Sequence, residues 1–274
     1  MSAIGVSTSS FFPLGLEDAF RLASESGADG VEVMITNDPA TYDPRVLSFL
    51  SRRFNMPILS FHAPVLLLTQ GVFGYNPAGK VEATAELAVQ LGADTIVVHP
   101  PFFWQVAYSR IFERHCGEVA RHCGVTVAVE NMFSLPVSSM TFDVYGKGWN
   151  PGALDVSTLT LDFSHAAMQS VSARDLARDW GSRLSHIHLC DGTSPHDDSY
   201  RFDAHLPPGY GSQPVGETLE DLGAGGFTGH VIAEVSTRSA KTDTARIERI
   251  GTSLEFSRAA LDRGRVQQLA VAAL

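Results

Sequence analysis

The sequence predicts an α/β protein built as a single (β/α)8 TIM barrel. Short runs of β-branched and other apolar residues alternate eight times with longer segments of helical periodicity, as in a barrel of parallel strands. The strand-forming runs are nearly continuous in apolar character, which is typical of strands covered on both faces. A chain of 274 residues suits one such domain, and no linker or low-complexity tract interrupts it. We therefore expect one domain over residues 1–274.

Eight strands are expected, each ending near polar or turn-forming residues. They lie at residues 3–8, 30–35, 57–62, 95–99, 125–131, 159–162, 184–189 and 230–235. A helical pattern follows each strand except the fifth, often ended by glycine. These helices are expected at residues 16–27, 44–54, 79–92, 106–124, in turns between 163 and 180, and at 214–225 and 242–263.

Two segments lie outside this alternation. The long loop 133–151 is rich in glycine, serine and aromatic residues and follows the fifth strand, where barrel loops build binding sites. We expect it to act as a lid. Residues 264–274 follow the last predicted helix and are expected to form a C-terminal tail.

The composition limits the class of protein and its partners. With 44% hydrophobic and 18% charged residues, the chain is typical of a soluble enzyme, and no apolar run approaches the length of a membrane span. The N-terminus lacks the basic region of a signal peptide, and three cysteines without framework spacing favour a reducing cytoplasm. A net charge of −10 makes nucleic acid an unlikely partner. Whether the chain forms a homo-oligomer is left open by the sequence.

Acidic or imidazole side chains end six consecutive predicted strands. They are His62, His99, Glu130, Asp162, His188 and Glu234. His165 follows three residues after Asp162, and the polar loop after the seventh strand adds Asp203 and His205. Barrel active sites lie at the carboxyl ends of the strands, and buried side chains of these types need a cation or one another. The sequence therefore predicts a metal site in the barrel mouth.

The segments around these residues resemble the xylose-isomerase-like barrel superfamily, which includes sugar phosphate isomerases and epimerases and endonuclease IV (AP endonuclease family 2). The matching segments, which span essentially the whole chain, are SFHAP, VVHPP, VAVEN, LDFSHA, HIHLCDG, DAHLPPGYG and IAEVS. In the isomerase branch, the resemblance implies one divalent metal, Zn or Mn, held by Glu130, Asp162, His188 and Glu234. In the endonuclease branch it implies two or three zinc ions, with His62 and His99 joining Glu130, and with His165, Asp203 and His205 as a third group.

The resemblance implies two alternative reactions. The first is a divalent-metal-dependent isomerase or epimerase of a sugar or sugar phosphate, acting through a metal-stabilised enediolate with Glu130 and Glu234 as the acid/base pair. The alternative is a multi-zinc phosphoesterase like endonuclease IV. We favour the isomerase because the loop after SFHAP reads VLLLTQGVFGYNP and lacks the basic residues expected of a DNA-binding surface. The expected partner is a small polyhydroxylated or phosphorylated substrate.

Five further residues are candidate substrate contacts. They are Glu32, Trp104, Lys147, Arg201 and Arg238. The three cations could bind a phosphate, although each is also explained by solvated surface charge, and Trp104 could stack on a sugar or pack in the lid. Glu32 ends the second strand and could equally form a structural ion pair. Asp191 could orient a ligand from a second layer.

A repeated RHCG motif also contains potential metal ligands. His115 and His122 are seven residues apart, which corresponds to about 10.5 Å along a helix. This separation is too large for one zinc ion, so we interpret them as ordinary helix residues.

Overall fold

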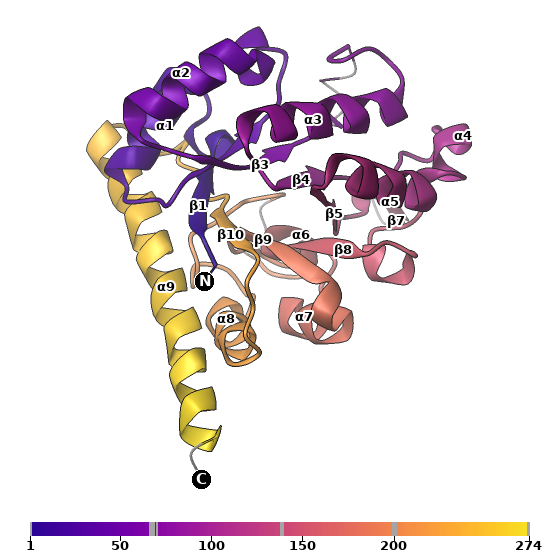
Figure 1. Ribbon diagram of the computed structural model, residues 1–274. Helices are drawn as coiled ribbons and strands as arrows, with labels where there is room; N and C mark the ends of the chain where they lie inside the picture. The colour runs from indigo at the N-terminus through magenta and orange to yellow at the C-terminus, as the bar shows by residue number, and fades with distance from the viewer. Residues whose placement is uncertain (1, 66–68, 70, 138–139, 199–201, 273–274) are drawn as a thin grey trace.

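The computed structural model describes residues 2–65, 69, 71–137, 140–198 and 202–272 (Figure 1). Eight parallel strands close into a barrel in the order β1-β10-β9-β8-β5-β4-β3-β2. They are β1 (Ile4–Ser7), β2 (Val31–Met34), β3 (Ile58–His62), β4 (Thr95–Val98), β5 (Thr126–Glu130), β8 (Thr158–Asp162), β9 (Leu184–Leu189) and β10 (His230–Ala233). The predicted (β/α)8 TIM barrel is confirmed, and the strand ends differ from the prediction by one or two residues.

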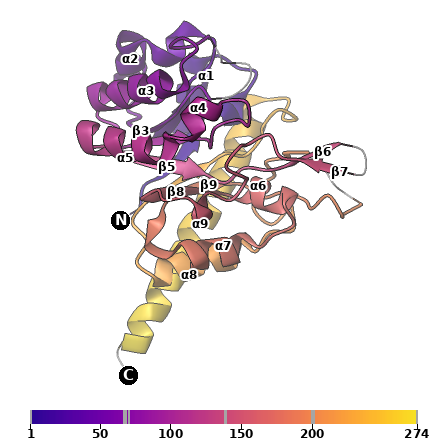
Figure 2. The same ribbon diagram turned by 90° about the vertical axis from the view of Figure 1, so that its right-hand side faces the viewer.

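Helices surround the barrel on its outside (Figures 1 and 2). They are α1 (Leu16–Glu25), α2 (Pro44–Phe54), α3 (Pro77–Leu91), α4 (Val106–Ser109), α5 (Phe112–Cys123), α6 (Phe163–Met168), α7 (Ala173–Trp180), α8 (Val215–Ala224) and α9 (Asp243–Ala272). The single helix expected over 106–124 is wrong, because the chain breaks at Arg110 and Ile111. The break lets Tyr108 of α4 and Phe112 of α5 both reach the core, where their rings pack edge to face at 5.6 Å.

The barrel interior is partly polar. Residues two apart on a strand share a face, so His186 and His188 of β9 both point inward. Their neighbours include Glu32, Ser60 and Thr160, and all five side chains are fully buried. Buried polar groups are normally hydrogen-bonded, and Glu32 joins His186, His188 and Ser60, whereas Thr160 Oγ1 and His186 Nδ1 have no partner. The apolar core lies instead mainly between the barrel and the helices.

The two segments outside the alternation differ from the prediction. The loop 133–151 contains a short antiparallel hairpin, β6 (Leu135–Val137) with β7 (Met140–Phe142), which projects from the barrel (Figure 2). Its role as a lid remains a prediction.

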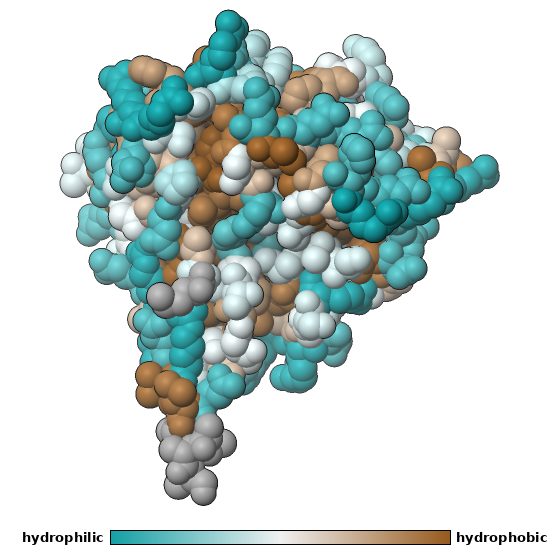
Figure 3. Space-filling view, in the orientation of Figure 1, coloured by the Kyte–Doolittle hydropathy of each residue, from teal (hydrophilic) through white to brown (hydrophobic). Residues whose placement is uncertain are grey.

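The C-terminal tail predicted at 264–274 is wrong, because α9 continues through it to Ala272. Gly264 does not end the helix but lets it approach α8, since a Cβ there would lie 1.9 Å from the Glu220 carbonyl oxygen. The projecting end of α9 exposes Val266 and Leu269. Figure 3 shows apolar surface near this end of the molecule. Within the described ranges, no helix, including α9, combines the length and apolar character needed to cross a membrane.

Candidate metal centre

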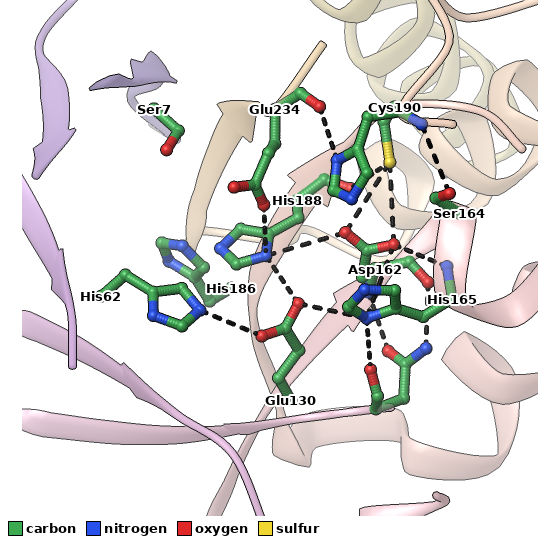
Figure 4. Close-up of polar contacts among 12 residues, drawn as sticks. Ser7, His62, Glu130, Asp162, Ser164, His165, His186, His188, Cys190 and Glu234 are labelled. Carbon is green, nitrogen blue, oxygen red and sulfur yellow. Dashed lines mark hydrogen bonds and ion pairs between the residues drawn. The ribbon is translucent and has the colours of Figure 1, made fainter. Parts of the chain in front are cut away.

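Four of the predicted ligands converge on one point in the barrel mouth (Figure 4). His188 Nδ1 lies 2.9 Å from Glu130 Oε1 and 3.0 Å from Glu234 Oε2. The Asp162 Oδ2 atom is 3.8 Å from the same nitrogen. One ligand atom from each of the four residues lies within 4.8 Å of all the others. The structure therefore brings the central set together, and its role as a set of metal ligands stays a prediction.

A second group shares Glu130 with the central one. His62 Nε2 and His99 Nε2 lie 3.3 and 3.0 Å from Glu130 Oε2, and only 3.2 Å from each other. In Figure 4, Glu130 lies between His62 on one side and His165 on the other. Glu130 can therefore bridge two cations through its two oxygens, as the resemblance implied.

The third group lies on the other side of Asp162. His165 Nε2 and His205 Nε2 are 3.4 and 2.9 Å from the same atom, Asp203 Oδ1. The backbones of Asp203 and His205 both have left-handed conformations, with φ of 44° and 43°. Non-glycine residues adopt this conformation at a cost of about 1–3 kcal/mol each and do so most often at functional sites. The strain is consistent with a loop shaped to present these two side chains.

Four of the imidazoles are oriented by a hydrogen bond from one of their two ring nitrogens. His62 Nδ1 donates to Ala63 O (3.1 Å), His165 Nδ1 to Asn131 O (2.8 Å), His205 Nδ1 to Glu234 O (2.8 Å) and His188 Nε2 to Glu32 Oε1 (3.1 Å). Such bonds select the tautomer whose other nitrogen can bind a metal. Four predicted ligands thus have the second layer of partners that metal-binding histidines usually have.

Buried charges dominate the electrostatics of the centre. Burial alone would raise the pKa of Glu130, but His188, His62 and His99 outweigh it and hold that pKa well below its usual range. Burial opposes charge on His188 as well, yet Glu234 and Glu130 raise its pKa well above the ordinary value. Burial raises the pKa of Asp162.

Individual histidines of the outer groups differ in the direction of their pKa shifts. Burial opposes charge on His62, but Glu130 outweighs it and raises the pKa. Burial lowers the pKa of His99 to about 4, so this imidazole is neutral and ready to bind a metal. Burial also opposes charge on His165, but Asp162 and Asp203 outweigh it and raise the pKa to about 10. A metal that binds His165 must therefore displace a proton.

These residues fit a divalent cation. The two Nε2 atoms of His62 and His99 converge on a single carboxylate oxygen, and three carboxylates surround one nitrogen of His188. Without a proton or a cation between them, so many lone pairs and charges would repel one another in a buried site. Carboxylates with one imidazole suit Mn, Mg or Zn, whereas the histidine-rich outer groups suit zinc.

Other residues that hold the centre in place were not found in the sequence. Ser9, in the short 3-10 helix η1 (Thr8–Phe11), donates to Glu234 Oε1 at 2.7 Å. Asn131 binds the backbone of Asp162 on both sides, through Nδ2 to the carbonyl (2.9 Å) and through Oδ1 from the amide (2.8 Å). Asn131 directly follows Glu130 in the VAVEN segment, so its position next to a candidate ligand could have indicated a role at the centre. No feature of the sequence indicates a role for Ser9.

The predicted substrate contact of Glu32 is wrong. Its side chain is fully buried below the metal centre, where it accepts from His188 Nε2 (3.1 Å), His186 Nε2 (3.0 Å) and Ser60 Oγ (2.7 Å). Burial would raise the pKa of Glu32, but His188 and His186 outweigh it and lower that pKa well below its usual value. The alternative interpretation, a structural ion pair, describes its position.

The remaining substrate candidates are spread around the mouth. The Lys147 ammonium is paired with Glu113 at 2.8 Å, which argues against a free phosphate-binding cation. The Arg238 guanidinium lies 5.7 Å from the centre of the Phe12 ring. Trp104 is 44% exposed and stacks on Phe102 with 4.6 Å between ring centres. Arg201 lies outside the described residues. Substrate contacts by Trp104 and Arg238 stay predictions.

Two other motifs have structural roles. The carboxylate of Asp191 accepts from four backbone amides, those of Gly192, Gly209, Gly211 and Gln213. It thus fixes the end of the loop that carries Asp203 and His205, and no ligand is needed to explain it.

The RHCG histidines lie on α5, and His115 Nε2 contacts Glu82 Oε1 at 2.9 Å. No group of potential metal ligands in the described part of the chain contains His115 or His122.

Comparisons with known proteins agree with this geometry. Residues 20–260 match the family model described as xylose isomerase-like TIM barrel. Proteins described as uncharacterized, from Mycobacterium leprae and Mycobacterium tuberculosis, are each 38% identical over 280 aligned residues, covering 95% of this chain and 98% of the relative.

Solved structures share the fold at lower identity. A D-tagatose 3-epimerase-like protein is 20% identical with a TM-score of 0.65, covering 94% of this chain and 98% of its own. The 3-keto-D-glucoside 4-epimerase of E. coli is 19% identical with a TM-score of 0.65, covering 94% and 100%. An AP endonuclease of family 2 from Brucella melitensis is 18% identical with a TM-score of 0.60, covering 89% and 96%.

Proposed function

Because this chain belongs to the xylose isomerase-like TIM barrel family, we propose that it is a divalent-metal-dependent isomerase or epimerase of a sugar or sugar phosphate. The main supporting observation is the convergence of Glu130 and Glu234 on His188 Nδ1, at 2.9 and 3.0 Å, with Asp162 completing the set. A divalent cation held by these four residues would supply a Lewis acid for the carbonyl and adjacent hydroxyl of the substrate.

Two carboxylates would move the proton. Glu130 comes from β5 and Glu234 directly follows β10, and they approach His188 from opposite sides in Figure 4. Isomerisation or epimerisation next to a carbonyl needs one group to remove a proton and another group, or the same one, to return it. Both carboxylates are held in place, Glu234 by the Ser9 hydroxyl and Glu130 by the surrounding imidazoles. Glu234 is the more exposed, 8% against 1%, and is our candidate for first contact with the substrate proton.

The solved structures with a similar fold favour the same class of reaction. Two of them have names that identify them as, or liken them to, epimerases of sugars or sugar derivatives. Their identity to this chain is 20% or less, so the argument for the reaction depends on the side chains of this centre and not on the neighbours.

A multi-zinc phosphoesterase is a second candidate. The observation that favours it is the assembly of both outer groups, His62 with His99 and His165 with His205, beside the central one. An AP endonuclease of family 2 is also among the fold neighbours. Against it, the net charge is −10, and Lys147, one of the three predicted phosphate-binding cations, is neutralised by Glu113.

The two candidates can be separated with one preparation of protein. Metal content per chain would be measured by mass spectrometry after Zn²⁺ or Mn²⁺ loading, alongside deuterium incorporation from D2O into a panel of ketoses and ketose phosphates. We expect one essential metal and exchange at the carbon next to the carbonyl, both dependent on Asp162 and His188. Incision of abasic duplex DNA without any exchange, by protein holding two or three zinc ions, would establish the phosphoesterase instead.

A further inference from the structure

An elongated groove opens beside the metal centre. It has a volume of about 490 Å³ and lies between the loop after β3 and the segment that follows β4. His99, whose Nε2 is 3.0 Å from Glu130, also lines the groove, so the groove and the metal centre share a wall. The volume lies within the range usual for small-molecule sites.

The lining of this groove is apolar and aromatic. It includes Pro64, Val65, Pro101, Phe102, Trp104 and Tyr108. Among the described lining residues, Lys80 and His99 are the ones with an ionisable nitrogen, and the Lys80 ammonium already donates to the carbonyls of Thr69 and Val72.

Two amide side chains that line the groove have their oxygens engaged by the chain itself. The side-chain oxygen of Gln105 accepts from the Phe102 amide, and that of Asn76 accepts from the Ala78 amide. A phosphate or a row of hydroxyls would lose its hydration here and gain few hydrogen bonds in return. An apolar group would lose nothing and would remove apolar surface from water.

One buried polar atom lies at the shared wall. His99 Nδ1 has no hydrogen-bond partner, although 6% of the residue is exposed. Buried ring nitrogens are normally paired, so a polar atom of a ligand is expected near the inner end of the groove. The site would then be polar at the metal centre and apolar beyond it.

We propose that the substrate is a keto sugar carrying an apolar substituent, such as an aryl or alkyl aglycone, and that this substituent lies in the groove between His99 and Trp104. This inference rests on the proposed function, because it places the sugar at the metal centre. It narrows the substrate class to substituted sugars and away from sugar phosphates. Phe102 stacks under Trp104 at 4.6 Å and holds the indole in place, and the remaining exposed part of the indole offers a surface for the substituent.

The test uses pairs of glycosides that differ only in the aglycone. Phenyl and methyl β-glycosides of glucose, galactose and mannose would be titrated by calorimetry into the Zn²⁺- or Mn²⁺-loaded protein. In at least one pair we expect the phenyl member to bind about tenfold more tightly or better, from the added apolar burial. The Trp104→Ala variant should reduce this ratio towards one.

A matched control guards against general adhesion to aromatic surface. Tyr210 is another exposed aromatic residue, 77% accessible, in the loop after β9 and outside the groove lining. The Tyr210→Ala variant should keep the full phenyl-to-methyl ratio. The inference would be overturned by any of three results. These are equal affinities for the phenyl and methyl members of all three pairs, no binding of any pair, or a phenyl-to-methyl ratio that Trp104→Ala does not change.

Deuterium exchange into ketoses by the same preparations separates this outcome from failure of the proposed function. If deuterium exchange is observed but phenyl and methyl glycosides bind equally well, only the groove assignment is refuted. A high ratio that depends on Trp104, without exchange into any sugar, would refute the reaction and keep the binding site.

Discussion

Replacement of Glu32 by glutamine should destabilise the fold and weaken the metal centre together. Glu32 accepts hydrogen bonds from three donors, His186 Nε2, His188 Nε2 and Ser60 Oγ, at 2.7–3.1 Å, and is fully buried. Glutamine has nearly the same volume, so no cavity forms. Its amide nitrogen can only donate, however, and it would face a ring N–H or a hydroxyl that also donates.

The magnitude follows from these contacts. Removal of one partner from a buried, hydrogen-bonded charge pair typically costs about 3–5 kcal/mol of unfolding free energy. The loss for Glu32→Gln should lie in that range for the metal-free protein. In addition, His188 would no longer be held with Nδ1 directed at Glu130 and Glu234, so metal affinity should fall about 10–100-fold, as for other partners that orient a ligand.

Ser60→Ala provides the matched control. It removes one donor to Glu32 and leaves both imidazole contacts intact, so we expect a loss of about 1 kcal/mol and little change in metal affinity. Urea unfolding of the metal-free proteins gives the first quantity, and competition with a chromophoric chelator gives the second. If Glu32→Gln lost under about 1 kcal/mol and bound metal as tightly as the native chain, our account of the barrel interior would be wrong.

Four further predictions address the centre itself. Glu234→Gln should preserve the circular dichroism spectrum but lower deuterium exchange about 10²–10⁴-fold, because an amide cannot accept the proton. His62→Ala should weaken substrate binding and retain the central metal; loss of one metal equivalent by mass spectrometry would favour the phosphoesterase. His165 has a folded pKa of about 10, raised above 6.5, so its contribution to the stability of metal-free protein is complete below pH 6.5 and is lost as pH rises towards 10. The melting temperature of chelator-treated protein should therefore fall between pH 8 and 10, and a His165→Asn variant should lack that fall. Fluorescence anisotropy should detect no binding to abasic duplex at about 0.15 M salt, and tight binding there would contradict our ranking of the two functions.

The convergence of the candidate metal ligands was predictable because their positions depend on local pattern and one general rule. Each of the four central residues is one of the last two residues of an apolar strand or directly follows it, and in a parallel barrel all strand ends reach the same mouth. Because of this rule, the proximity of Glu130 and Glu234 can be predicted without knowing the order of the strands around the barrel. The loop ligand Asp203 was found for another reason, since polar residues crowd the segment that follows β9.

The supporting residues could not be predicted because their contacts depend on distant register. Glu32 meets His186 across 154 residues of sequence, and Ser9 meets Glu234 across 225. Whether Glu32 points into the barrel depends on the pairing of β2 with β3, which is irregular between Val31 and Glu32. A carboxylate at the end of a strand looks the same in the sequence whether it faces the open mouth of the barrel or its closed interior. The sequence alone therefore could not distinguish a substrate contact from a structural ion pair for Glu32.

The polar interior explains why the metal centre and the fold depend on each other. A TIM barrel interior is usually filled by branched apolar side chains, but here Glu32, His186 and His188 occupy that volume and are stable only as a connected network. The upper end of the network is His188 Nδ1, where Glu130 and Glu234 would otherwise remain charged beside each other. A bound cation neutralises that end, and a ligand at 1,000 times its dissociation constant adds about 4.1 kcal/mol to stability. Such a gain is comparable with the loss expected for Glu32→Gln. A metal at Nδ1 would therefore act on the same His188 side chain that Glu32 holds through Nε2.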